Sequence, residues 1–286
     1  MNQVVATFYH FFDFPEFAEH RLPLLGEVKR LGITGTILLA SEGINGTIAG
    51  ARENIDSGLA HLRENIIKTP FTHKESYCAA SPFRRAKVRL KKETISLGEP
   101  VSLSNAGEYV DAKHWNELLD DPETIVIDAR NAYEAHLGSF ENALNPQTRN
   151  FKELPAYARK TLGAFKQRKI AAFCTGGIRC EKFTAWLRAE GFEHVYHLQG
   201  GILKYLEEVP EKMSKWQGEC YVFDERVAVG HGLKASSTAT QCDACGHTLT
   251  PDDRSHPLYQ SGVSCPFCDG SGVSCKKSRV LPKASF

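Results

Sequence analysis

The feature that most constrains the fold is a short apolar run that ends in a cysteine and is followed by two glycines. Residues 169–174 are nearly continuously apolar, as expected for a strand buried on both faces of a parallel sheet. Residues 181–190 carry a helical pattern that ends at Gly191. The chain between strand and helix must turn tightly, and Gly176 and Gly177 allow this turn without side-chain clashes. These residues predict a parallel α/β domain with a cysteine loop at one strand end.

The loop is predicted to activate Cys174 as a nucleophile. Backbone N–H groups of the turn converge on the sulfur, with the positive end of the next helix behind them. Arg179 adds a fixed cation, and this environment lowers the pKa of a thiol. A buried structural cysteine is the alternative. Cys180 either resolves an intermediate on Cys174 as a disulfide or is an inert packed thiol. The residues expected to bind an anion in the loop are Thr175, Gly176, Gly177 and Ile178.

The chain is predicted to form three parts, with boundaries at 1–95, 106–212 and 213–286. The first part shows the order β-α-β-β-α-β, which is typical of a ferredoxin-like or acylphosphatase-like domain. The second alternates strands and helices, which indicates a parallel sheet. The third is a small cysteine-rich segment, and residues 230–241 before its cysteines have a linker composition.

Within the first part, the elements follow from apolar spacing and turn residues. A polar turn at residues 41–46, with Asn45-Gly46 near its end, is expected to join two strands and is a weaker candidate for contacting phosphate. The expected elements are strands at 4–12, 33–40 and 46–49, helices at 15–31 and 55–66, and an extended stretch that ends in 84–92.

Residues 84–92 carry six positive charges in nine residues. In a strand, the cations at every second position share one face at a spacing of about 7 Å, while Val88 and Leu90 face the core. Such a row can follow a phosphate backbone. The alternatives are a solvated face or a protected sheet edge. The candidate nucleic-acid contacts are Arg84, Arg85, Lys87, Arg89 and Lys91.

Two Cys-x-x-Cys pairs near the C-terminus are separated by 19 residues. This spacing is typical of a structural zinc site with four thiolates, which is closed to chemistry. Reduced thiols in a flexible tail are the alternative. The candidate ligands are Cys242, Cys245, Cys265 and Cys268, with Cys275, His247 and His256 as spare or substitute ligands. Cys78 and Cys220 are expected to be core thiols.

Three segments of the second part resemble the rhodanese family. They are Val-Ile-Asp-Ala-Arg at 126–130, the loop at 174–179 with cysteine first and arginine last, and residues 195–202. The resemblance implies that Cys174 is the persulfide-carrying residue of rhodaneses and that Asp128 and Arg130 belong to a supporting signature. Related phosphatases have a loop longer by one residue, so phosphate ester chemistry is disfavoured.

A narrower resemblance joins residues 35–47, 83–92 and 174–182, which occur together in the TrhO-type tRNA uridine(34) hydroxylases. This family has an acylphosphatase-like domain before a rhodanese domain, and the resemblance covers roughly residues 1–230. It implies a tRNA partner, molecular oxygen as co-substrate and conversion of the wobble uridine to 5-hydroxyuridine. Cys174 then acts as a Michael nucleophile on C6 of uracil or as a carrier of persulfide or oxidised sulfur. No flavin or nicotinamide motif is visible.

Composition limits the remaining classes of function. With 42% hydrophobic residues, 24% charged residues and a formal net charge of +1, the chain is that of a globular protein. Its longest apolar stretch, residues 33–40, is too short to span a bilayer, and no secretory signal precedes it. We therefore expect a cytoplasmic enzyme with reduced cysteines and no membrane partner; its protein partners are unknown. The alternatives are a sulfurtransferase that carries a persulfide and a zinc-bearing RNA- or protein-binding adaptor.

Overall fold

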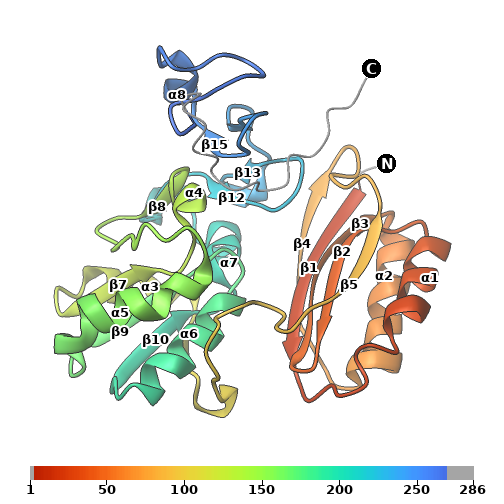
Figure 1. Cartoon of the computed structure of the whole chain (residues 1–286), viewed down its shortest axis with the longest axis horizontal. Helices are drawn as coiled ribbons and strands as arrows, with labels where there is room; N and C mark the ends of the chain where they lie inside the picture. The colour runs from red at the N-terminus through yellow and green to blue at the C-terminus, as the bar shows by residue number, and fades with distance from the viewer. Residues whose placement is uncertain (1–2, 269–286) are drawn as a thin grey trace.

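The computed structural model describes residues 3–268 and has three parts (Figure 1). An N-terminal sheet domain stands beside a central α/β domain, and a small cysteine-rich part lies above the central domain in this view. The predicted fold class is confirmed in all three parts: acylphosphatase-like, rhodanese-like with a parallel sheet, and cysteine-rich.

The N-terminal domain is a five-stranded sheet in the order β4-β1-β3-β2-β5. Two helices cover one face of this sheet (Figure 1), and the parallel pairing of β5 with β2 adds a strand to the β-α-β-β-α-β unit. The basic segment is therefore a fifth strand at one edge, rather than the last strand of that unit, which is β4 at the other edge. The elements are β1 (Gln3–Phe11), α1 (Arg21–Arg30), β2 (Thr34–Ala40), β3 (Gly43–Gly50), α2 (Arg52–Leu62), a π-helical turn (Arg63–Ile67), β4 (His73–Cys78) and β5 (Ala86–Leu90).

Two local expectations for this domain are wrong. The first helix begins at Arg21 and not at residue 15, because Pro23 lacks the N–H that a longer helix would need there. The turn between β2 and β3 lies at residues 41–42, while Asn45 and Gly46 pair inside the sheet. Gly43 ends this turn at φ +133°, and a side chain there would clash with the carbonyl of His10.

Alternation along the strands separates a core face from a face that looks toward the central domain. Ile37, Ile48 and Val88 are buried beneath the helices, as expected for Val88. Leu90 was also expected to face the core, but 41% of its surface is exposed, because β5 ends there at the edge of the sheet. The opposite face of the sheet forms one wall of a cavity that is described below.

The central domain has a four-stranded parallel sheet in the order β6-β10-β9-β7. Separate apolar clusters lie on its two faces, one around Phe183 and Trp186 and the other around Trp115 and Phe173. Its elements are β6 (Glu108–Val110), α3 (Ala112–Asp120), β7 (Thr124–Asp128), α4 (Ala132–Ala135), β8 (Gly138–Phe140), α5 (Leu154–Leu162), β9 (Lys169–Phe173), α6 (Ile178–Ala189), β10 (His194–Leu198) and α7 (Gly201–Glu208).

The chain after α7 continues into the same core. Trp216, Val222 and Leu233 are buried against the cluster that holds Trp115. The expectation of a linker at residues 230–241 is therefore wrong at its start, because Leu233 is part of the core. This segment also contacts the N-terminal domain, because Arg226 donates to Ser76 Oγ at 2.7 Å. Its strands are β11 (Trp216–Gly218), β12 (Cys220–Tyr221) and β13 (Ala228–Val229).

The cysteine-rich part is docked on α4 of the central domain. Thr248 Oγ1 donates to the carbonyl of Tyr133 at 2.5 Å, and His136 Nε2 lies 2.7 Å from Asp253 Oδ2. Its elements are β14 (Thr240–Gln241), β15 (Thr248–Leu249) and α8 (Pro251–Ser255). Across residues 3–268, no helix has the length and apolar character needed to cross a membrane.

Candidate functional site

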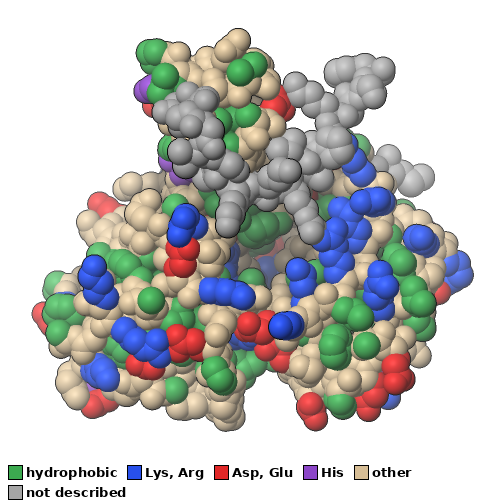
Figure 2. Space-filling model, in the orientation of Figure 1, with side chains coloured by type: hydrophobic (Ala, Val, Ile, Leu, Met, Phe, Trp, Pro, Cys, Tyr) green, Lys and Arg blue, Asp and Glu red, His purple; other side chains and the backbone are tan. Residues whose placement is uncertain are grey.

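A cavity of about 1760 Å³ lies between the N-terminal sheet and the central domain. Tyr9 and Lys74 line it from the N-terminal side, and Cys174 and Arg179 line it from the central domain. Figure 2 shows a hollow in the middle of the molecule, with Lys and Arg side chains on its right-hand rim over the N-terminal domain. The predicted reactive cysteine therefore lies where the two domains meet.

The loop after β9 wraps its backbone around the Cys174 sulfur. Cys174 is fully buried, and the N–H of Gly177 donates to its Sγ at 3.2 Å. The backbone N–H of Cys180 donates to the carbonyl of Gly177 at 3.0 Å, and the Cys180 thiol lies beside Cys174 and helps to lower its pKa. Gly177 has φ +103°, which requires glycine, whereas Gly176 has an ordinary φ and open space around it. The predicted need for glycine thus holds for Gly177 and not for Gly176.

These contacts stabilise the ionised form of Cys174. Burial alone would raise the pKa of this thiol. The hydrogen bonds from Cys180 and Gly177 and the charge of Arg179 outweigh burial and lower the pKa to about 5. The pKa of Cys180 moves upward, because burial and the neighbouring Cys174 disfavour a second negative charge. The pair therefore holds one thiolate and one thiol at neutral pH.

Arg179 is held by a buried carboxylate that the sequence analysis did not assign to the site. Both terminal nitrogens of Arg179 donate to Glu134, at 2.6 and 2.7 Å, and both side chains are almost fully buried. Burial would raise the pKa of Glu134, but the charge and hydrogen bonds of Arg179 lower it. Thr175 Oγ1 also donates to Glu134, at 3.3 Å. Glu134 lies four residues after the rhodanese-like segment 126–130, and this closeness was the available signal.

Asp128 and Arg130 form a second buried ion pair behind the loop. Arg130 donates to both carboxylate oxygens of Asp128, at 2.9 and 2.5 Å, and to the carbonyl of Gly138 at 2.7 Å. Neither residue lines the cavity. Their geometry supports the segment that carries Glu134, so their effect on the site is indirect.

Four polar residues around the loop were not predicted from the sequence: Tyr9, Lys74, Tyr109 and Glu181. Tyr9 donates to Glu181 Oε1 at 2.5 Å, and burial together with the nearby Glu181 carboxylate raises the pKa of Tyr109. Lys74 Nζ donates to the carbonyl of Gly176 at 2.9 Å. Tyr9 and Lys74 belong to the N-terminal sheet, far away in sequence, and no motif around them indicates this contact.

The five predicted nucleic-acid contacts lie on β5 or within two residues of its ends. Lys87 and Arg89 pair with Thr36 and Leu38, whose side chains line the cavity, and Lys91 lines the cavity itself. Arg85 is exposed, and Arg84 forms an ion pair with Glu225 at 3.0 Å. Of the five cations, Lys91 lines the cavity and Lys87 and Arg89 lie on the strand beside its wall, whereas Arg84 and Arg85 do not line it.

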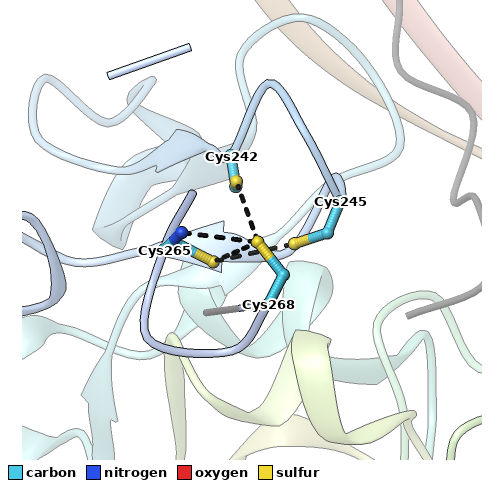
Figure 3. Close-up of side chains that lie close together, drawn as sticks. All are labelled: Cys242, Cys245, Cys265 and Cys268. Atoms are coloured by element: carbon cyan, nitrogen blue, oxygen red, sulfur yellow. Dashed lines mark hydrogen bonds between the residues drawn. The ribbon is translucent and has the colours of Figure 1, made fainter. Parts of the chain in front are cut away.

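The four predicted zinc ligands come together, with all four sulfur atoms within 4.8 Å of one another. In Figure 3 their side chains point toward a common centre. Three of the six sulfur–sulfur distances are 3.6 to 3.8 Å, close to the edge of about 3.8 Å expected for a tetrahedron with Zn–S bonds of about 2.3 Å. The predicted substitutes His247 and His256 are outside this cluster, and Cys275 lies outside the described residues.

The fold and the site define a rhodanese-type protein with an acylphosphatase-like N-terminal domain. Residues 3–94 match the family described as "UPF0176 acylphosphatase like domain", and residues 111–208 match the rhodanese-like domain family. Among solved structures, the Alr3790 protein from Anabaena sp. is 24% identical with a TM-score of 0.32 and covers 38% of this chain and 91% of its own. An acylphosphatase from Coxiella burnetii is 13% identical with a TM-score of 0.25, covering 31% and 93%.

A curated relative defines the family more closely. The tRNA uridine(34) hydroxylase of Picosynechococcus sp. (strain ATCC 27264 / PCC 7002 / PR-6) is 48% identical over 282 residues, which cover 98% of this chain and 94% of the relative. The chain belongs to the tRNA uridine(34) hydroxylase family, as the resemblance in its sequence predicted.

Proposed function

We propose that this protein hydroxylates the wobble uridine of tRNA to 5-hydroxyuridine, with molecular oxygen as co-substrate. The observation that carries the proposal is the Cys174 thiolate at a cavity lined by both domains. Ligand pockets for small molecules are about 300–1000 Å³, so a cavity of about 1760 Å³ has room for a nucleotide together with its flanking backbone. The relative's name supports tRNA as the substrate.

The chemistry begins with attack of the Cys174 thiolate on C6 of uracil. A bond forms between sulfur and C6, and the electron pair of the C5–C6 double bond moves onto C5 and O4. C5 is then nucleophilic enough to take one oxygen atom from dioxygen. Loss of the C5 proton and cleavage of the sulfur–C6 bond restore the ring. The loop N–H groups and Arg179 stabilise the sulfur as an anion at the start and at the end of this sequence.

The second oxygen atom of dioxygen requires two electrons and two protons to become water. Cys180 lies beside Cys174, and its thiol takes the second oxygen atom as a sulfenic acid. The Cys174 thiolate released from C6 then displaces that oxygen as hydroxide, which a solvent proton converts to water, and the two sulfurs become a disulfide. The balance is uridine, dioxygen, one thiolate, one thiol and one proton giving 5-hydroxyuridine, water and one disulfide. A cellular thiol then reduces the disulfide for the next turnover. This step gives Cys180 a chemical role. Its position beside Cys174 favours this role over inert packing.

We assign a separate role to each of the three parts of the chain. Residues 1–95 bind tRNA, with the cations of β5 along its phosphates, and an unstacked wobble base enters the cavity at low cost. Residues 106–212 carry the catalytic loop. Residues 213–286 supply strands to the central core and a structural zinc ion held by the four cysteines, which closes a part too small for its own core. The enzyme works in the cytoplasm, where its tRNA substrate is.

The test is nucleoside mass spectrometry of tRNA from cells that lack the gene and are complemented with variants. Wild type restores 5-hydroxyuridine or its derivatives, and Cys174→Ser does not, although it still binds tRNA in a filter-binding assay. Cys180→Ser distinguishes disulfide formation from inert packing as the role of the second thiol. Serine retains the packing of Cys180 but cannot form the disulfide. Unchanged 5-hydroxyuridine with altered thiolated nucleosides would contradict the proposal and favour a sulfurtransferase.

A further inference from the structure

Lys74 links the N-terminal domain directly to the cysteine loop of the central domain. It lies on β4, paired with Thr7, and both residues line the cavity. Its Nζ donates to the carbonyl of Gly176 at 2.9 Å and also to the carbonyl of Gly200. One side chain of the N-terminal sheet therefore holds two turns of the other domain, the cysteine loop and the turn before α7.

A single peptide unit connects Lys74 to the reactive sulfur. The carbonyl of Gly176 accepts the hydrogen bond from Lys74, and the N–H of the same peptide, that of Gly177, donates to Cys174 Sγ at 3.2 Å. Because a peptide is planar, the direction of its carbonyl sets the direction of its N–H. A cation at the carbonyl end also polarises the N–H at the other end, which strengthens that hydrogen bond.

We propose that Lys74 is a positioning residue, which orients and polarises the Gly176–Gly177 peptide so that its N–H stabilises the Cys174 anion. The consequence is that the reactive thiolate of the central domain depends on a side chain of the tRNA-binding domain. The inference rests on the proposed role of Cys174, which it deepens by assigning a residue that sets the state of the nucleophile.

Titratable groups from four elements face Lys74 and Cys174. Burial and, to a smaller extent, nearby Lys204 lower the pKa of Lys74 to about 8, while the charge of Cys174 acts in the opposite direction. Lys74 therefore still carries its proton at neutral pH. The facing groups are Tyr9 of β1; Arg179, Cys180 and Glu181 of α6; Lys204 and Glu207 of α7; and Cys220 of β12.

The competing explanation is that any positive charge in the cavity would stabilise the Cys174 anion to the same degree. Lys204 provides the matched control for this explanation. Lys204 lines the same cavity, but its Nζ contacts Gln199 at 3.5 Å and Glu208 at 3.7 Å rather than the cysteine loop. Lys204→Met removes one charge from the cavity and leaves the Gly176 carbonyl with its partner. Lys74→Met removes both the charge and the hydrogen bond, and Lys74→Arg keeps a charged donor.

The experiment measures alkylation of Cys174 by iodoacetamide as a function of pH, in the full-length protein without tRNA. Peptide mass spectrometry assigns the modified cysteine. The midpoint of the rate profile reports the ionisation of the thiol, and the plateau rate reports its accessibility, so opening of the cavity is separated from a change in ionisation. Thermal unfolding of each variant checks that it is folded, and Lys74→Gln replaces Lys74→Met if the latter is unfolded.

Loss of one hydrogen bond to a charged group predicts an upward shift of the midpoint by about one pH unit in Lys74→Met. The midpoint of Lys74→Arg should lie much closer to wild type than that of Lys74→Met, because arginine keeps a charged donor. The midpoint of Lys204→Met should stay near the wild-type value. Equal shifts in Lys74→Met and Lys204→Met, or no shift in either, would overturn the inference. The assay needs neither tRNA nor oxygen, so this result is independent of whether the protein hydroxylates uridine.

Discussion

At the scale of single residues, the site depends on a charged pair that is almost fully shielded from water. Arg179 was predicted from the loop sequence, whereas its partner Glu134 comes from α4, 45 residues earlier. Sequence patterns identify Cys174 and Arg179 because both lie in one continuous loop. They do not identify Glu134, Tyr9 or Lys74 as members of the site, because these reach the loop only through tertiary contacts.

Glu134→Gln should destabilise the central domain by about 3–5 kcal/mol at neutral pH, since it leaves the charge of Arg179 buried without its counter-ion. The pKa of Glu134 is lower in the folded protein than in the unfolded chain, so the ion pair stabilises the fold at pH values above the ordinary glutamate pKa. This stabilisation is lost as the pH falls through the pKa that Glu134 has in the folded protein. Thermal unfolding at neutral and acidic pH measures both effects. Glu190→Gln, in an exposed pair with Arg159, is the control and should change little. Equal behaviour of the two variants would contradict this reading.

At the scale of elements, the repeated strands and helices of both domains were predictable from apolar spacing, but their ends and pairings were less so. The basic strand β5 was expected, whereas its place as a fifth strand parallel to β2 was not, because edge pairing leaves no periodic signal. The segment after α7 contains short strands with weak alternation, so its contribution to the core was also missed.

The start of α7 makes an element-scale prediction. Gly201 has φ +66°, and a Cβ there would clash with the carbonyl of Cys174 and lie 2.7 Å from that of Thr175. Gly201→Ala should therefore cost at least about 2 kcal/mol in unfolding free energy and displace the cysteine loop. Gly163→Ala is the control, since its Cβ meets open space at an ordinary φ. Denaturation of the two variants, followed by circular dichroism, tests this, and an unaffected Gly201→Ala protein would refute it.

The edge strand β5 predicts how tRNA affinity changes with salt. Lys87→Ala and Arg89→Ala should each weaken binding and reduce the slope of log affinity against log salt by about 1, as expected when one phosphate contact is lost. The measurement is filter binding of tRNA across a range of salt concentrations. Lys160→Ala, an exposed lysine on α5 of the central domain, should leave the slope unchanged. Equal slopes for all three variants and wild type would remove β5 from the tRNA interface.

At the scale of the whole molecule, three parts meet around one cavity, and this arrangement was not predictable from sequence. Sequence spacing did predict the four-cysteine cluster, because paired Cys-x-x-Cys motifs are a local signal for zinc. Its docking on α4, the helix that carries Glu134, depends on contacts such as Thr248 with Tyr133 that have no such signal.

The cysteine cluster predicts one zinc ion per chain, measurable by elemental analysis of the purified protein. Chelation should raise amide hydrogen exchange across residues 240–268 and leave the central sheet protected, because the metal supplies the folding energy of this part only. Cys265→Ser should reproduce the chelated pattern, whereas Cys78→Ser, outside the cluster, should not. Retained protection after complete metal removal would show that the cluster needs no ion.

The most direct test of the central claim is a reaction of the purified protein with tRNA, a thiol reductant and isotopically labelled dioxygen, followed by mass spectrometry of the nucleosides. We expect 5-hydroxyuridine at the wobble position, with the heavy isotope at its new oxygen, for wild type and not for Cys174→Ser. Oxygen taken from labelled water instead, or equal product from both proteins, would contradict it.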